Sequence, residues 1–129
     1  MIVGVIVALL AMTPSQSCEN ADTTADIVEC ANENYRIADA EMTGVWKAAY
    51  AKMKKLDLDN PPRLKSELGH AQTLLDSQRK WIAFRDAQCR VVGNRMRGGS
   101  GQGYSTTFCL IDVTRGRTVE LRETAEFGE

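Results

Sequence analysis

The amino-acid sequence predicts an all-α fold: a long antiparallel helical hairpin plus a third helix, stapled by two disulfides. Apolar and small residues recur every three or four positions along two long segments, and no segment alternates as a half-buried strand does. A short polar turn separates the two segments, so the helices are expected to lie antiparallel. At 1.5 Å per residue each would be roughly 48 Å long.

The first helix is predicted over about residues 24 to 56. Thr23 fits the N-cap position, and Asp26 stands where a capping box places its acidic residue. The polar segment 57–60 ends the helix. The positions expected to face the core are Ile27, Cys30, Ile37, Met42, Val45, Ala49, Met53 and Leu56.

The second helix is predicted to begin at Pro61, with Asn60 as its N-cap, and to stop at Gly93. Gly69 inside it is expected to mark a kink or a close helix contact. Steps of four and three predict packing on a neighbouring helix. The stripe consists of Leu64, Leu68, Ala71, Leu75, Gln78, Ile82, Arg85, Cys89 and Val92. A third helix, about 105–125, would cover one end of the hairpin.

The N-terminus predicts export. Residues 2–12 form an apolar run too short to cross a bilayer, and Ser15 and Ser17 supply small residues for a signal peptidase. We therefore expect a signal peptide over 1–17, a helical domain over 18–129, and a periplasmic or secreted protein. No Lys or Arg precedes the run, so a true start further upstream is one open alternative. Acylation of Cys18 is the other, and membrane attachment is expected only in that case.

Four cysteines in an exported chain of this length indicate two disulfides. Three pairings are possible. The most local joins Cys18 to Cys30 and Cys89 to Cys109, each worth on the order of 3 kcal/mol. The spacings contain no Cys-x-x-Cys and the chain has one histidine, His70, so we expect no zinc, no other metal and no cofactor.

The net charge of -1 conceals an asymmetry. Residues 18–41 hold seven acids and one base, whereas residues 63–97 hold eight bases and three acids. Mutual neutralisation of the two segments is the interpretation we favour. The alternative is an exposed acidic face that steers a cationic partner, formed by Asp22, Asp26, Glu29 and Glu33. Export, the low net charge and the lack of aromatics among the basic residues disfavour nucleic-acid binding.

One helical face in segment 78–89 is unusually polar. Gln78, Trp81, Arg85 and Cys89 are spaced 3, 4 and 4 apart and share that face. A buried amide or guanidinium without a hydrogen bond costs a few kcal/mol, so these side chains need partners. We expect structural roles, with Trp81 in the core, Asp39 or Glu41 as carboxylate partners, and Asp86 turned toward Arg90. The structural set comprises Gln78, Trp81, Arg85, Asp86, Thr114 and Arg117.

The glycine-rich segment 98–103 does not predict an enzyme. It lacks the last glycine of G-x-S-x-G, follows no predicted strand, and contains no Gly-Lys-Ser/Thr. The only histidine stands on a different helix, where it is a poor candidate base for Ser100. We therefore expect a binding protein without catalytic residues.

The chain resembles the LprI-type lysozyme inhibitors, small exported bacterial proteins, over about residues 18–121. The resemblance rests on Cys18 and Cys30, Ala38-Asp39-Ala40-Glu41-Met42, Gln78-x-x-Trp81-x-x-x-Arg85-Asp86-x-x-Cys89, Gly99-Ser100, and Cys109-x4-Thr114-x2-Arg117-x3-Leu121. The family usually shows Leu-Asn and then Tyr in its first helix, where this chain has Met42-Thr43 and Trp46.

The resemblance implies a disulfide-bonded helical domain that binds lysozyme and blocks it. The acidic face would speed association with the basic enzyme. A flexible loop carrying Arg97, Ser100 and Tyr104 would enter its acidic cleft. The alternative function is a structural or envelope-stress interaction module with no lysozyme activity.

Overall fold

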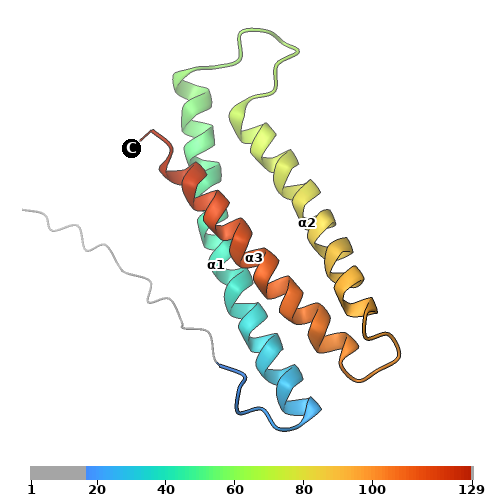
Figure 1. Cartoon of the computed structure of the whole chain (residues 1–129). Helices are drawn as coiled ribbons and strands as arrows, with labels where there is room; N and C mark the ends of the chain where they lie inside the picture. The colour runs from blue at the N-terminus through green and yellow to red at the C-terminus, as the bar shows by residue number, and fades with distance from the viewer. Residues whose placement is uncertain (1–16, 129) are drawn as a thin grey trace, which may run out of the picture.

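The computed structural model describes residues 17–128, which form three helices: α1 (Thr24–Asp59), α2 (His70–Asn94) and α3 (Gln102–Glu126). In Figure 1, α2 runs antiparallel to α1, and α3 returns in the direction of α1 and lies along it. No strand occurs between residues 17 and 128. The all-α prediction is confirmed, whereas the expected signal peptide falls almost wholly outside the described residues.

Helix α1 follows the sequence prediction closely. The Thr23 hydroxyl accepts a hydrogen bond of 3.1 Å from the backbone N–H of Asp26, which satisfies one of the free donors at the helix start. At the other end, the N–H of Asn60 donates to the carbonyl of Leu56 at 2.8 Å. The helix therefore extends three residues beyond the predicted end.

The predicted start of the second helix is wrong. Residues 60–69 form a loop, and α2 begins only at His70. Leu64 and Leu68, predicted as the first core positions, are 61% and 67% exposed, because they lie in this loop and not on the face of a helix packed against α1. Asn60 consequently ends α1 and does not cap α2.

Asp57 supplies the cap of α2 from the end of α1. Its carboxylate accepts hydrogen bonds from the N–H groups of His70 at 2.6 Å and Ala71 at 3.1 Å. A Cβ on Gly69 would lie 3.0 Å from both carboxylate oxygens, so glycine permits this close approach. Gly69 is thus the N-cap residue of α2. It marks a close approach to α1, as one of the two expectations had it, whereas the kink within a longer helix is absent.

Helix α3 is longer than predicted and lies elsewhere. It packs most extensively on α1 along its length and does not merely cover one end of the hairpin. Its buried positions follow helical spacing and form a continuous stripe that explains this placement. They are Ile111, Thr114, Thr118 and Leu121.

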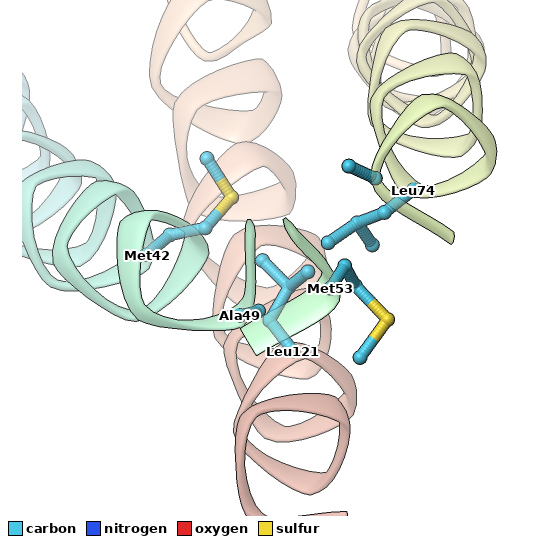
Figure 2. Packing of buried hydrophobic residues seen from close by; sticks show 6 residues of the cluster. Met42, Ala49, Met53, Leu74 and Leu121 are labelled. Atoms are coloured by element: carbon cyan, nitrogen blue, oxygen red, sulfur yellow. The ribbon is translucent and has the colours of Figure 1, made fainter. Parts of the chain in front are cut away.

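The core lies where the three helices meet. Figure 2 shows Met42, Ala49 and Met53 on α1 facing Leu74 on α2 and Leu121 on α3. Several buried positions are alanines, which bury little area but let helices approach closely. A core of this size gains from covalent staples.

Two disulfides provide those staples. Cys18 is joined to Cys30, with 5.9 Å between their Cα atoms, and Cys89 is joined to Cys109, with 5.4 Å. The most local pairing is therefore confirmed. A sulfur held in a disulfide is not free for acylation, which argues against the lipoprotein alternative at Cys18. Such bonds indicate an oxidising, extracytoplasmic compartment.

Helices α1, α2 and α3 are each too polar or too short in apolar sequence to cross a membrane, so none of the described helices is a candidate span.

Candidate functional site

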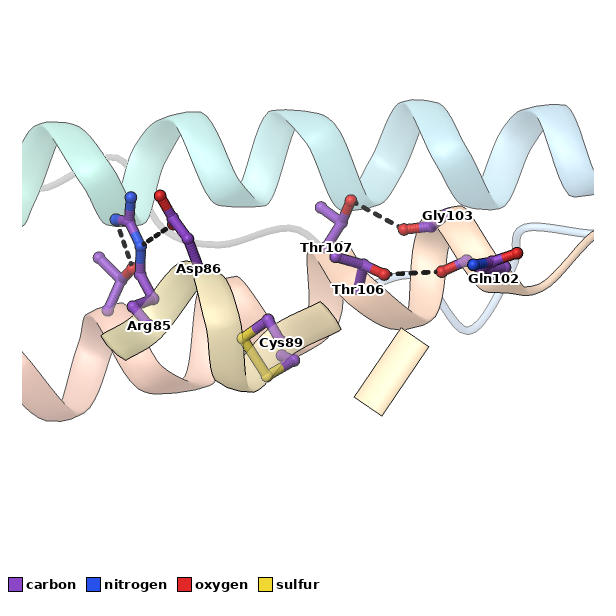
Figure 3. Close-up of a disulfide and its surroundings, with 9 residues drawn as sticks. Arg85, Asp86, Cys89, Gln102, Gly103, Thr106 and Thr107 are labelled. Atoms are coloured by element: carbon purple, nitrogen blue, oxygen red, sulfur yellow. Dashed lines mark hydrogen bonds and ion pairs between the residues drawn. A yellow bond between two sulfur atoms is a disulfide. The ribbon is translucent and has the colours of Figure 1, made fainter. Parts of the chain in front are cut away.

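Arg85 on α2 is the centre of a polar cluster between the helices. Its Nε donates to Asp86 at 3.0 Å, and its Nη1 lies 3.5 Å from the hydroxyl of Thr114 on α3 and 3.7 Å from the carboxylate of Asp39 on α1. Figure 3 shows this side chain one turn before the disulfide of Cys89. The Arg85 side chain is 9% exposed, so these contacts link all three helices from within.

Two aspartates contact Arg85, one of them as expected and the other not. Asp39 is one of the two carboxylates expected beside the buried polar groups, and it does contact Arg85. Asp86 was expected to turn toward Arg90, but it reaches back to its neighbour Arg85. Arg85 is buried and Arg90 is exposed. A charge-assisted hydrogen bond to the poorly solvated Arg85 guanidinium is therefore stronger than one to the solvated Arg90 guanidinium.

Aromatic rings surround the same guanidinium. Its Cζ lies 5.2 Å from the centre of the Trp81 ring and 5.8 Å from that of Tyr35. Burial, the largest influence, raises the pKa of the Tyr35 hydroxyl. Trp81 is only partly buried and lies at the edge of the core, in contact with Arg117 as well, at 5.7 Å.

Gln78 and Arg117 form a second link between α2 and α3. The Gln78 carbonyl accepts from Arg117 Nε at 3.0 Å, and its amide nitrogen lies 3.8 Å from the Met42 sulfur on α1. Arg117 also donates to Ser77 at 3.0 Å and to Glu120 at 2.8 Å. The polar motif is therefore satisfied by partners inside the protein, as expected of a scaffold.

Several residues of this scaffold were not singled out from the sequence. Tyr35 lies four residues before Asp39, which places both on one side of α1, and that spacing was the available signal. Asn34, four residues after Cys30, lies 3.5 Å from the Cys18 sulfur and is 6% exposed. Ser77 offered no signal, because its role depends on where Arg117 arrives from another helix.

The acidic residues at the start of α1 face solvent. Asp22, Asp26 and Glu29 are exposed, and Glu33 is partly so. Arg36 donates to the Glu33 carboxylate at 3.0 and 2.6 Å, and these hydrogen bonds lower the pKa of Glu33. We call Asp22, Asp26, Glu29 and Glu33 the acidic face.

Mutual neutralisation of the acidic and basic segments, which the sequence favoured, does not describe the acidic face. Asp39 pairs with Arg85 from the basic segment, and Glu41 pairs with Arg122 on α3 at 3.2 Å. The acids nearer the N-terminus instead lie on the exposed side of α1. Most of the acidic face is thus exposed to solvent, with Glu33 paired to Arg36.

A hydrogen bond and a disulfide brace the loop between α2 and α3, which the sequence predicted to be flexible. Gly98 has a φ of +80°, which favours glycine, and its N–H donates to the Gln102 side chain at 3.2 Å. The disulfide between Cys89 and Cys109 joins the two helices that flank the loop. These helices also pack closely beside the loop, because a Cβ on Gly93 would collide with the Thr106 hydroxyl. Figure 3 shows Gln102 and Thr106 on α3 beyond that disulfide.

Within this braced loop, the three residues predicted to bind a partner differ in exposure. Arg97 and Ser100 are exposed, whereas Tyr104 is partly buried and stands in the first turn of α3, with its ring 6.2 Å from that of Phe108. Arg97 and Ser100 therefore form the accessible tip.

The acidic face and the loop tip occupy the same end of the bundle. In Figure 1 the start of α1 and the α2–α3 loop both lie at the lower end, opposite the α1–α2 loop. His70 starts α2 at the upper end, so it lies a helix length from Ser100 and is not its catalytic base. Across residues 17–128, no three His, Cys, Asp or Glu side chains cluster as metal ligands do.

Comparisons of the sequence with known proteins identify the family of this chain. The sequence profile of the family described as "Lysozyme inhibitor LprI" matches residues 15–121. An uncharacterized protein of Rhizobium meliloti (strain 1021) is 35% identical over 119 residues, which cover 92% of this chain and 86% of that protein. No solved structure matches the chain. Because the match spans both disulfides and all but the last five residues of α3, the chain belongs to the LprI lysozyme inhibitor family.

Proposed function

We propose that this protein is a periplasmic or secreted inhibitor that binds lysozyme and blocks it, and that it is not itself an enzyme. The observation that carries the proposal is the family match over residues 15–121. The disulfides support it, because lysozyme acts on the cell wall outside the cytoplasm.

The acidic face supplies the long-range part of recognition. Lysozymes of the c type are basic proteins, so an exposed group of carboxylates at one end of the inhibitor attracts them and orients the encounter. Asp22, Asp26 and Glu29 are suited to this role because they are exposed and not enclosed by other helices.

The loop tip supplies the short-range part. Arg97 and Ser100 project from a loop that is already held by a hydrogen bond and a disulfide. Binding therefore costs little conformational entropy for ordering the loop backbone. The Arg97 guanidinium matches the charge of lysozyme's acidic cleft, and the Ser100 hydroxyl both donates and accepts hydrogen bonds. The tip is therefore the element that we assign to the cleft.

The proposal is tested by measuring association and dissociation rates with a c-type lysozyme on a biosensor surface. Changing the four residues of the acidic face to lysine should slow association more than it speeds dissociation. Changing Glu123 and Glu126 to lysine is the matched control, because these exposed acids lie at the other end of the bundle. Arg97→Ala and Ser100→Ala should chiefly speed dissociation. An equal effect of both sets of reversals would contradict the assignment of the acidic face.

The second candidate is a structural or envelope-stress interaction module without lysozyme activity. One observation favours it. The most distinctive motif of the chain, around Arg85 and Arg117, holds the helices together, and its polar side chains are engaged in contacts within the protein. A folded, disulfide-intact protein that binds no lysozyme in the biosensor experiment would support this alternative.

A further inference from the structure

One side of α1 is uncovered along nearly its whole length. Its members recur every three or four residues, with two adjacent pairs toward the C-terminus, and all are exposed except the partly exposed Glu33. We call this side the outer α1 face. It consists of Asp26, Glu29, Glu33, Arg36, Ala40, Gly44, Lys47, Ala48, Ala51, Lys54 and Lys55.

Charge on the outer α1 face is divided between its two halves. The half toward the N-terminus holds three acids and one base, Arg36, which pairs with Glu33. The half toward the C-terminus holds three lysines, at positions 47, 54 and 55, followed by one exposed acid, Asp59, at the helix end. Lys54 also lies over the Tyr50 ring at 4.8 Å, which leaves its ammonium at the surface. A helix with one acidic and one basic half is complementary to its own antiparallel copy.

We propose that two copies of this protein associate through their outer α1 faces, antiparallel and related by a two-fold axis near Gly44. Such a symmetric contact uses the same surface on both copies. In this register Glu33 faces Lys55 of the second copy, and Ala40 faces Ala48, because the members of each pair are equally distant from Gly44 along the sequence. The acidic half of each copy therefore lies along the lysine-containing half of the other copy, so this contact occurs twice in the dimer.

The centre of the face suits close helix contact. The separation of two packed helices depends on the side chains at the contact, and here these are mainly Ala40, Gly44 and Ala48. A Cβ on Gly44 would meet no atom within 4 Å, so nothing inside the protein requires glycine at this position. Glycine inside a helix destabilises it relative to alanine, whereas a second helix crossing at that point would make use of the missing side chain.

The association is expected to be weak and sensitive to salt. Exposed ion pairs contribute little individually and are screened by dissolved ions. A contact made by one pair of helices is also smaller than the interface of a permanent dimer. The dimer should therefore exchange with monomer over an accessible range of protein concentration.

Sedimentation equilibrium of the disulfide-intact protein tests the proposal without lysozyme present. At 0.01 M ionic strength, where the screening length is about 30 Å, the protein should show a concentration-dependent monomer–dimer equilibrium, and at 1 M it should be chiefly monomeric. A protein that stays monomeric at every concentration and salt level would overturn the proposal.

Charge exchange between the halves identifies the surface. One variant carries Asp26→Lys, Glu29→Lys and Glu33→Lys, and the other carries Lys47→Glu, Lys54→Glu and Lys55→Glu. Each alone presents halves of like sign and should dimerise about tenfold more weakly or worse. Mixed together they should form a heterodimer, which also shows that both are folded. Failure of the mixture to associate, or unchanged dimerisation of each variant alone, would overturn the assignment.

A glycine comparison tests the centre of the contact. Gly44→Leu should weaken the dimer by filling the space between the helices. Gly116→Leu is the matched control, because Gly116 is exposed in the middle of α3 and a Cβ there likewise meets nothing within 4 Å. Both changes replace glycine in an exposed helix, so both should preserve folding. Equal dimerisation of the two variants would contradict a contact centred near Gly44.

Discussion

Arg85 shows how far a single residue can be understood from sequence. Its spacing from Gln78, Trp81 and Cys89 correctly placed the four side chains on one face of a helix. The partners of Arg85 were harder to predict, because they depend on the rotation and axial position of α1 and α3. Asp39 was among the candidates, but Thr114 and Tyr35 became partners only once three helices had met.

Replacing Arg85 should weaken the fold. Arg85→Ala removes the positive charge between Asp39 and Asp86 and the filling between two aromatic rings, so the free energy of unfolding should fall by roughly 2 to 4 kcal/mol. Urea unfolding followed by circular dichroism measures this change. Arg79→Ala, on the exposed side of the same helix, is the control and should change stability by less than about 0.5 kcal/mol. A stable Arg85→Ala variant that has lost lysozyme binding would show that Arg85 belongs to the binding site.

At the level of elements, periodicity predicted three helices, and α1 began where the sequence indicated. The start of α2 was missed because Asn60-Pro61 has the composition of a helix start and Leu64 and Leu68 continue the spacing. Those leucines lie in the loop before α2 and are exposed, so helical spacing in the sequence was not sufficient to place them in the core. The true cap comes from Asp57, on another helix, which no local pattern reveals.

The Asp57 cap makes a testable contribution that depends on pH. Backbone hydrogen bonds from Ala71 and His70 lower the pKa of Asp57. Its stabilising effect is therefore present above the ordinary aspartate pKa and is lost as the pH falls through the lower value in the folded protein. Asp57→Ala should lower the Tm by a few degrees at neutral pH, and the difference from wild type should shrink in acid. Asp59→Ala, two residues along, is the control, and a pH-independent difference would contradict this role.

The disulfide between α2 and α3 should act on stability and not on helix content. Replacing both Cys89 and Cys109 with serine opens a loop of 20 residues, which in an unstrained case costs on the order of 3 kcal/mol. The Tm should fall by several degrees while the circular dichroism at low temperature stays helical. Free thiols at both positions in the exported protein would contradict the pairing.

At the scale of the whole molecule, the cysteine count predicted two disulfides, and the motif spacing indicated the family whose sequence profile the chain matches. Charge counting located the acidic segment, but the interpretation that the basic segment neutralises it was wrong for its N-terminal part, which is exposed. Whether those carboxylates are neutralised depends on which side of α1 they occupy once α3 has packed along it. Likewise, only the arrangement of helices brings the acidic face and the loop tip to one end.

The most direct test of lysozyme inhibition is the loss of turbidity of a bacterial cell suspension treated with a cationic lysozyme. An excess of the disulfide-intact protein should slow lysis, and the effect should weaken as ionic strength rises through the physiological range, where the screening length is about 8 Å. Undiminished lysis by several lysozyme types in the presence of excess folded protein would contradict the proposed function.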